Sequence, residues 1–140
     1  MSTLNKKTLF VGDVMMGLDR APVIKSNVIL KEAMEVMGRA GLGIVCIVDD
    51  DNKLLGVLTD GDIRRKLLKV QKPFSALLVD DALDHSITLP VTIMVNDALI
   101  SALELMEKKQ IWDLPVVDDH RNLVGLLHLH PVVQALMGIK

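Results

Sequence analysis

The sequence contains little cysteine and few aromatic residues. Its 140 residues include one cysteine, two phenylalanines, one tryptophan and no tyrosine. A single cysteine excludes a disulfide framework within the chain, and a reducing, cytoplasmic setting is expected. Cys46 lies in the apolar run of residues 42–48, where a free cysteine is typically a small buried hydrophobe. With so few aromatic side chains, aliphatic residues and the eight methionines must fill the core.

A strong charge of one sign and long hydrophobic runs are also absent. The formal net charge is −2 and no basic stripe stands out, which gives no electrostatic case for nucleic acid as a partner. No apolar run approaches the roughly 20 residues that span a bilayer. Residues 1–7 are polar and lack the apolar region of a signal peptide. We therefore expect no nucleic-acid partner and no membrane partner.

Signatures of catalysis and of metal binding are missing as well. The order of residues indicates no Ser-His-Asp or Cys-His triad, no P-loop and no zinc motif. The acidic turn at residues 49–52 lacks the glycine and the glutamate that an EF-hand loop requires. We expect no catalytic residues, no metal ion and no required cofactor.

The sequence does contain an internal repeat. A shift of 69 positions superposes Asn27 on Asn96, Leu30 on Leu99, Ala33 on Ala102, Glu35 on Glu104, Leu54 on Leu123 and Gly56 on Gly125. We place the repeats at residues 9–70 and 76–138, with residues 1–8 as an N-terminal linker. A unit of about 60 residues is marginal for a core of its own, so the two should pack together about a pseudo-two-fold axis.

Each repeat predicts the element order β-α-β-β-α, which places the fold in the α/β (α+β) class. In the first repeat, residues 21–24 read as a short extended piece. Helical spacing predicts a helix over residues 27–39, with Asn27 as its N-cap. Residues 44–48 and 54–58 predict a pair of strands, and residues 60–69 predict a closing helix.

The segment GVLTDGDIRR, residues 56–65, joins the last strand of the first repeat to its last helix. Thr59 and Asp62 have the spacing of a capping box, which would only prevent fraying of the helix. A helix N-terminus also attracts anions, so the same residues could hold a phosphorylated ligand. Arg64 and Arg65 follow, either as part of a solvated helix face or as donors to phosphate.

Two β-α-β-β-α units, the first ending in this motif, resemble a tandem CBS-domain pair, also called a Bateman module. The resemblance covers about residues 9–138. The strings GVLTDGDIRR and, in the second repeat, GLLHLH are most similar to the C-terminal regulatory region of arabinose-5-phosphate isomerase-type sugar isomerases. Related strings occur in CBS pairs attached to sugar-nucleotide transferases. The resemblance implies a catalytic partner, either a sugar-phosphate isomerase or a nucleotidyltransferase domain.

The resemblance also implies a ligand, either an adenine nucleotide (AMP, ADP or ATP) or a sugar nucleotide of the pathway. By the family pattern, Asp62 would accept hydrogen bonds from the ribose hydroxyls and Thr59 would donate to a phosphate oxygen. Arg64 and Arg65 would add charge-assisted bonds to phosphate. The residues expected to flank the base are Ala21, Pro22, Val23, Gly43 and Ile44.

The second repeat departs from this pattern. His128 replaces the threonine, and Pro131, which offers no carboxylate, replaces the aspartate. We therefore expect one competent ligand site per chain. His128 and His130 alternate, so on a continuing strand they would share one face. They are either a simple exposed pair or pocket-lining groups that sense pH or contact a sugar phosphate. A metal site with His85 or His120 is the less favoured alternative, because no cysteine or paired carboxylate lies at ligand spacing beside them.

Two functional hypotheses remain. The first is a regulatory, ligand-sensing module that acts on a partner catalytic domain in sugar-phosphate metabolism. The second is a structural dimerisation module that binds no small molecule, and a homodimer is expected in either case. Trp112 is either an anchor at a dimer contact or an ordinary, partly buried side chain.

Overall fold

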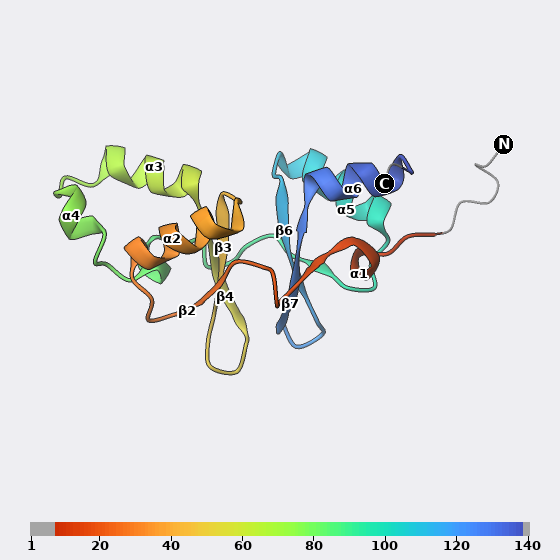
Figure 1. Cartoon of the computed structure of the whole chain (residues 1–140), viewed down its shortest axis with the longest axis horizontal. Helices are drawn as coiled ribbons and strands as arrows, with labels where there is room; N and C mark the ends of the chain where they lie inside the picture. The colour runs from red at the N-terminus through yellow and green to blue at the C-terminus, as the bar shows by residue number, and fades with distance from the viewer. Residues whose placement is uncertain (1–7, 139–140) are drawn as a thin grey trace.

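The computed structural model describes residues 8–138 and contains two sheets, each with its own helices. The linker predicted at residues 1–8 therefore lies outside the described residues, apart from Thr8. The first repeat consists of β2 (Val23–Lys25), α2 (Leu30–Ala40), β3 (Ile44–Val48), β4 (Leu54–Thr59) and α3 (Asp60–Lys69). The second consists of β5 (Ile93–Met94), α5 (Leu99–Lys109), β6 (Asp113–Val117), β7 (Leu123–His128) and α6 (Leu129–Leu136) (Figure 1). The predicted order β-α-β-β-α is confirmed in both.

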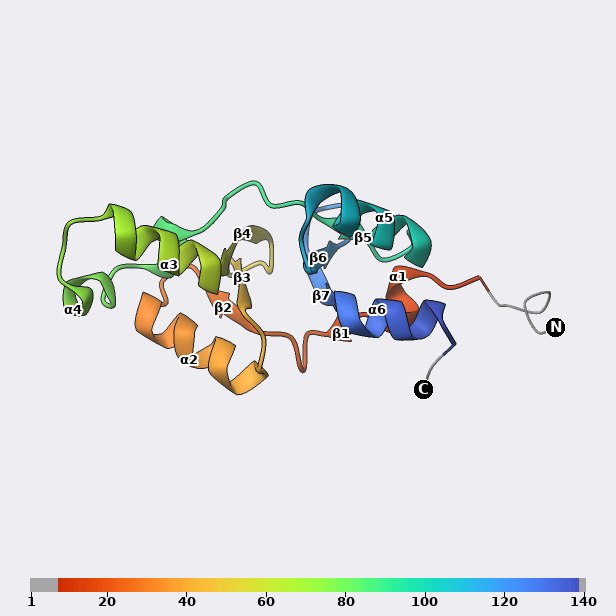
Figure 2. The same cartoon turned by 90° about the horizontal axis from the view of Figure 1, so that it is seen from above.

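The two sheets have the same internal pairing. In the first sheet β2 is parallel to β3, and β3 is antiparallel to β4. In the second, β5 is parallel to β6, and β6 is antiparallel to β7. Helices α2 and α3 cover the outer face of the first sheet, while α5 and α6 cover the second (Figure 2). The fold is thus a mixed α and β structure of two similar halves.

The halves are joined by a shared core between the sheets. Along β3, Val45 and Ile47 face the helices, whereas Ile44, Cys46 and Val48 face the second sheet. Every residue of β3 is buried, as expected for a strand that is covered on both faces. Leu123 and Leu126 of β7 complete this central cluster. The predicted burial of Cys46 is confirmed, and its burial raises the pKa of the thiol to about 12.

Hydrogen bonds at the two hairpin turns display the pseudo-two-fold relation directly. The N–H group of Leu54 donates to the carbonyl of Arg121 at 3.0 Å, and that of Leu123 donates to the carbonyl of Asn52 at 3.0 Å. The two acceptors, Asn52 and Arg121, also share the left-handed backbone conformation, with φ of 67° and 63°. Equivalent atoms therefore pair across the interface in both directions.

The segments that lead into each repeat cross to the other repeat. The N-terminal part forms α1 (Val11–Val14) and β1 (Met16–Gly17), and β1 pairs antiparallel with β7 of the second repeat. Val11 is fully buried in the core of that second repeat. In the same way, Ile87, which leads into the second repeat, bridges to Val57 of β4. The two repeats are therefore interlocked.

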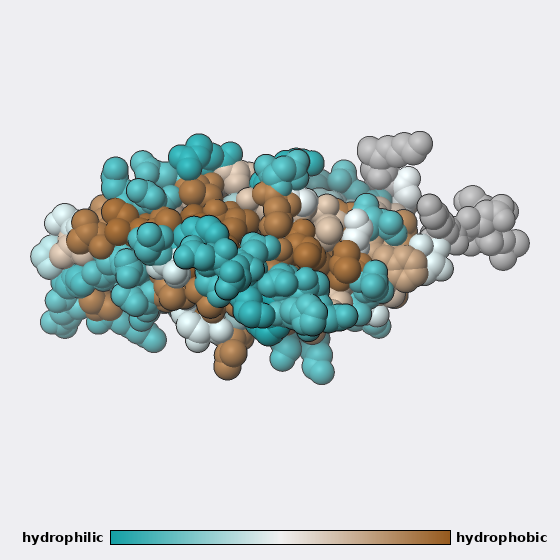
Figure 3. Space-filling model, turned by 90° about the horizontal axis from the view of Figure 1, so that it is seen from below, coloured by the Kyte–Doolittle hydropathy of each residue, from teal (hydrophilic) through white to brown (hydrophobic). Residues whose placement is uncertain are grey.

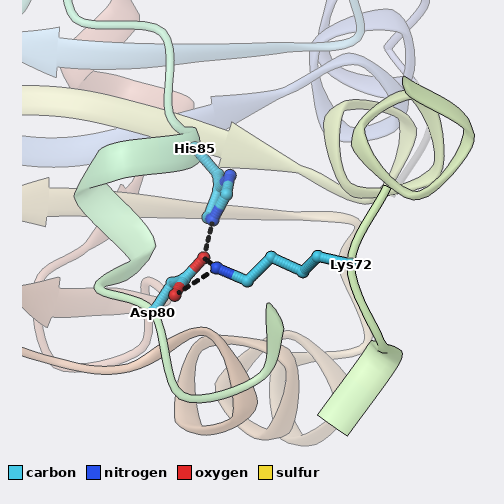
Figure 4. A network of polar contacts seen from close by, with 3 residues as sticks. All are labelled: Lys72, Asp80 and His85. Atoms are coloured by element: carbon cyan, nitrogen blue, oxygen red, sulfur yellow. Dashed lines mark hydrogen bonds and ion pairs between the residues drawn. The ribbon is translucent and has the colours of Figure 1, made fainter. Parts of the chain in front are cut away.

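A short helical segment, with α4 (Phe74–Leu77) and the 3₁₀ helix η2 (Ala82–His85), connects the repeats and packs on the first core. Asp80 is central to this segment, because its carboxylate accepts hydrogen bonds from Lys72 at 2.9 Å and contacts His85 Nε2 at 2.9 Å (Figure 4). The carbonyl of Asp80 also accepts from the N–H of Leu30 at 2.8 Å.

That last contact corrects one sequence prediction. Asn27 is not the N-cap of α2; the helix begins at Leu30, and its N-cap is Ile29, which makes no side-chain cap. The first N–H groups of α2 are satisfied instead by carbonyls of the connecting segment, those of Asp80 and Leu78. A local side-chain cap is therefore unnecessary.

Candidate ligand-binding cleft

A cleft of about 810 Å³ opens between the two repeats. Apolar side chains make up most of its wall, and polar side chains from both repeats project from the ends of β4 and β7 and from α3. Its lining residues include Thr59, Arg64, Leu89, Trp112, Asp113 and His128. The size and the mixture of apolar wall with few polar groups are typical of a small-molecule site.

The two repeats contribute equivalent segments to this cleft. Residues 41–44, which join α2 to β3, face residues 110–113, which join α5 to β6. Thr59 at the end of β4 is matched by His128 at the end of β7. Residues 87 and 89–91 close one side. Equivalent segments of the two repeats thus line the cleft, although the two halves differ in chemistry.

On the first repeat, Thr59 and Asp62 form a reciprocal capping box at the start of α3. The hydroxyl of Thr59 accepts from the N–H of Asp62 at 3.1 Å, and the carboxylate of Asp62 accepts from the N–H of Thr59 at 3.0 Å. The capping alternative is therefore confirmed as a structural fact. The hydroxyl of Thr59 lines the cleft and keeps its proton to donate, whereas Asp62 is not among the lining residues.

The two arginines of α3 line the cleft, but only one of them is paired with a carboxylate. Arg65 donates to Asp62 at 2.8 Å and lies over Gly61, whose added Cβ would be 3.2 Å from the guanidinium. Arg64 makes no ion pair or side-chain hydrogen bond within residues 8–138. Arg64 is thus available to an anionic ligand at once, and Arg65 would have to leave Asp62 first.

On the second repeat, His128 is paired with Asp113. The ring Nδ1 lies 2.8 Å from Asp113 Oδ1, and both side chains are largely buried. Burial raises the pKa of Asp113; the hydrogen bond to His128 partly offsets this rise, and the nearby charge of Asp60 adds to it. No side-chain cap forms at His128, because Pro131 occupies the position of Asp62 and has no N–H group to offer.

The close approach of Gly43 to Asp60 shapes the centre of the cleft. The N–H of Asp60 donates to the carbonyl of Gly43 at 3.0 Å. A Cβ atom at position 43 would lie 2.6 Å from Asp60 Oδ2, so any larger residue would displace that carboxylate. Trp112, the equivalent of Gly43 in the second repeat, is instead 68% exposed at the cleft.

The structure brings together some of the predicted site residues and separates others. Those that line the cleft are Thr59, Arg64, Arg65, Gly43, Ile44 and His128. His130 lies within α6 and is exposed, so the prediction that it continues a strand beside His128 is wrong. Ala21, Pro22 and Val23 do not line the cleft; Ala21 and Val23 pack against the core between the sheets.

Several cleft residues were not predicted from the sequence. The segment of residues 87 and 89–91, rather than residues 21–23, supplies the apolar wall beside Thr59, and Leu89 is 86% exposed there. Asp113 and Trp112 were not assigned to the site either. The repeat contained a signal for them, since a shift of 69 positions places them opposite Ile44 and Gly43.

Two negative findings apply to residues 8–138. No cluster of three or more histidine, cysteine, aspartate or glutamate side chains is placed to hold a metal ion within that range. Over the same residues, every helix is too short or too polar to cross a membrane.

Comparison with proteins of known sequence shows relatives along nearly the whole chain. An uncharacterized protein of Helicobacter pylori (strain J99) is 35% identical over 139 residues, covering 98% of this chain and 40% of that protein. The arabinose 5-phosphate isomerase KdsD of Francisella tularensis is 30% identical over 129 residues, covering 92% of this chain and 38% of the isomerase. The chain thus spans about two fifths of the length of these relatives.

Solved structures show the same fold. CBSX2, crystallised in complex with AMP, has a TM-score of 0.81 and 26% identity, covering 92% of this chain and 96% of CBSX2. The CBS domain pair of protein MJ0100 has a TM-score of 0.79 and 22% identity, covering 96% of this chain and all of that pair. The model of the CBS domain matches residues 11–69 and again residues 84–138. With two matched domains that account for most of its length, the chain belongs to the CBS-domain family as a tandem pair.

Proposed function

We propose that this chain is a regulatory, ligand-sensing module that binds an adenine nucleotide in the cleft between its repeats. The observation that carries the proposal is the cleft itself, in which Thr59, Arg64 and Arg65 project beside an extended apolar wall. Arginine binds phosphate through charge-assisted hydrogen bonds, and the hydroxyl of Thr59 can donate to a phosphate oxygen. The apolar wall suits the planar base. Asp62 would hold the backbone of Thr59 in place through the capping box. Arg65 would exchange its hydrogen bond to Asp62 for one to the phosphate.

The comparisons support this choice of ligand. CBSX2, 26% identical to this chain, was crystallised with AMP. A sugar nucleotide of the same pathway fits the same combination of phosphate and ring, and it remains an alternative ligand. Neither requires a cofactor for catalysis, because the module is proposed to sense and not to catalyse.

The proposed partner is a catalytic domain of sugar-phosphate metabolism, either a sugar-phosphate isomerase or a nucleotidyltransferase, in the cytoplasm. The relation to KdsD, of which this chain covers 38%, supports an isomerase. Ligand binding regulates such a partner only if it favours one arrangement of the module over another. A ligand in this cleft would contact both repeats, so a change in their relative arrangement would change its affinity.

Calorimetric titration with AMP, ADP, ATP and CMP tests the proposal, together with thermal unfolding. A ligand at about 100 times its dissociation constant should stabilise the fold by about 2.7 kcal/mol. Arg64→Gln should weaken nucleotide binding about tenfold, the loss of one charge-assisted bond. Arg39→Gln, exposed on α2 and outside the cleft, is the matched control and should bind normally. Absence of binding by all four nucleotides would refute the proposal.

A second candidate function is a structural dimerisation module without a ligand. It is favoured by large apolar side chains that remain exposed near α3 and α4, with Leu68 80% exposed and Val79 64% exposed. Figure 3 shows hydrophobic residues reaching the surface along much of one face. Sedimentation equilibrium measures the oligomeric state and so tests this function. A strictly monomeric chain would refute it, and a dimer whose Leu68→Ser variant is monomeric would support it.

A further inference from the structure

The cleft has two chemically different halves, although equivalent positions build them. The first repeat supplies Gly43, a hydroxyl at Thr59 and the cationic side chains of α3. The second repeat places Trp112 and His128 at the positions equivalent to Gly43 and Thr59. The first half therefore favours an anion. The second half offers the aromatic face of Trp112 beside the hydrogen-bonded pair of His128 and Asp113.

Trp112 is exposed but its backbone is fixed. Its side chain is 68% exposed, and Leu89, which also lines the cleft, is 86% exposed. Large apolar side chains left open in a cleft favour an apolar partner, and the indole of Trp112 offers a flat face on which a ring can stack. The carbonyl of Trp112 accepts from the N–H of Leu129 at 2.8 Å, and the next residue, Asp113, is bound to His128. The backbone that carries the indole is therefore already positioned before a ligand arrives.

The pair beside Trp112 accepts hydrogen bonds. With Asp113 ionised, the 2.8 Å contact places the proton of the neutral imidazole on Nδ1. The other ring nitrogen, Nε2, is then an acceptor, and the contact with Asp113 is the one side-chain hydrogen bond of this ring within residues 8–138. Asp60, close enough to raise the pKa of Asp113, adds a second carboxylate. A phosphate would be repelled here, whereas hydroxyl or amino groups would be bound.

We propose that the second repeat binds the nucleoside end of the ligand: the base stacks on Trp112, and a ribose hydroxyl donates to Nε2 of His128. The phosphate then points to Thr59, Arg64 and Arg65 on the first repeat. This inference rests on the proposed function and adds the orientation of the ligand. Asp113 acts as a positioning residue, because it fixes the tautomer and the orientation of the imidazole.

The fluorescence of the wild-type chain gives the first test. Trp112 is the only tryptophan and the chain has no tyrosine, so its emission reports on the cleft alone. AMP and adenosine should both change the emission, with excitation at the red edge of the tryptophan band where adenine does not absorb. Ribose 5-phosphate, which lacks the base, should leave it unchanged.

Calorimetry on variants gives the second test. Trp112→Leu should bind both AMP and adenosine about tenfold or more weakly, because base–aromatic stacking is lost. Trp112→Phe keeps an aromatic face and should retain most of the affinity. Arg64→Gln should weaken AMP but leave adenosine unchanged. For the contact with His128, 2′,3′-dideoxy-AMP should bind the wild type more weakly than AMP does. This difference should disappear in His128→Phe, which keeps a ring but has no hydrogen-bond acceptor.

The outcomes separate this inference from the proposed function. If AMP binds but neither the emission nor the Trp112→Leu affinity changes, the orientation is wrong and the nucleotide-sensing function stands. If dideoxy-AMP and AMP bind the wild type equally, the role given to His128 is wrong. If AMP does not bind at all, the proposed function fails and this inference fails with it.

Discussion

Gly56 and Gly125 occupy equivalent positions in β4 and β7, and each lies against the backbone of a segment that has crossed from elsewhere in the chain. A Cβ atom on Gly56 would be 2.8 Å from the carbonyl oxygen of Ile87, and one on Gly125 would be 2.6 Å from that of Met16. Contacts this short with backbone atoms cannot be relieved by a rotamer change. Glycine at these two positions therefore permits the interlocking of the repeats.

Alanine at either glycine should be destabilising. Gly56→Ala and Gly125→Ala would each push a crossing segment off its sheet and cost about 1–3 kcal/mol of unfolding free energy. The control is Gly38→Ala in α2, where an added Cβ meets nothing within 4 Å and helix propensity should add about 0.5–1 kcal/mol. Urea unfolding measures all three. A Gly125→Ala variant as stable as the wild type would show that β1 can shift away from β7 at little cost, which would contradict this role for the glycine.

The reciprocal cap of Thr59 and Asp62 leads to a second prediction. Thr59→Ala removes the acceptor for the N–H of Asp62 and should cost about 1 kcal/mol. Thr59→Ser keeps the hydroxyl and should restore nearly all of it. Because the cap lies beside the cleft, nucleotide affinity should be measured on the same variants. Loss of affinity in Thr59→Ala with recovery in Thr59→Ser would show that the hydroxyl serves ligand and helix together.

Much of the fold could be predicted from the sequence, because the determining signals are local. The apolar, β-branched run at residues 44–48 is β3 with the predicted bounds, and α3 spans Asp60–Lys69 as predicted. The repeat then extends these assignments to the second half. Asn27 was misassigned because the first N–H groups of α2 bind carbonyls about fifty residues further along the chain. No local pattern reveals such a partner.

The candidate site could be predicted only in part, and for a related reason. Thr59 and Arg64 carry motif signals of their own, and both line the cleft. Residues 21–23 were assigned by family pattern to the same site, but the crossing of the leading segments places residues 87 and 89–91 there instead. Trp112 carries no motif, and its place in the cleft follows only from its equivalence to Gly43.

The contacts of Asp80 predict a dependence of stability on pH. Hydrogen bonds from Lys72 and then from His85 lower the pKa of the Asp80 carboxyl (Figure 4). A carboxyl with a lowered pKa stabilises the fold above its unfolded-state pKa, and this contribution is lost as the pH falls through the folded-state pKa. Lys72→Met should therefore be less stable than the wild type at pH 7, with the difference disappearing in strong acid.

Urea unfolding at pH 7 and at a pH below the folded-state pKa of Asp80 measures this effect. The matched control is Lys31→Met, since Lys31 and Glu35 are both exposed and 3.7 Å apart, and such a pair contributes little. His85→Asn tests the contact between His85 Nε2 and the Asp80 carboxylate. It also removes Nδ1 of His85, which is buried without a partner in the described part of the chain. A Lys72→Met difference that persists unchanged in acid would show that packing, and not the carboxylate, is responsible.

The pKa of Asp113 is raised, whereas that of Asp80 is lowered, so the expected dependence of stability on pH is also reversed. Burial raises the pKa of this carboxyl, so the stability it contributes is present below the unfolded-state pKa and is lost as the pH rises through the folded-state pKa. At pH 7 the ionised, buried carboxylate therefore lowers the free energy of unfolding.

Asp113→Asn keeps the size of the side chain and a hydrogen-bonding oxygen for His128, and it should raise Tm at pH 7. This gain should shrink as the pH falls and the wild-type carboxyl becomes protonated. Asp119→Asn, exposed in the turn that follows β6, should leave Tm nearly unchanged at every pH. A lower Tm for Asp113→Asn at pH 7 would mean that the charge of Asp113 stabilises His128 by more than its burial costs, so that the pair is held by ionic attraction.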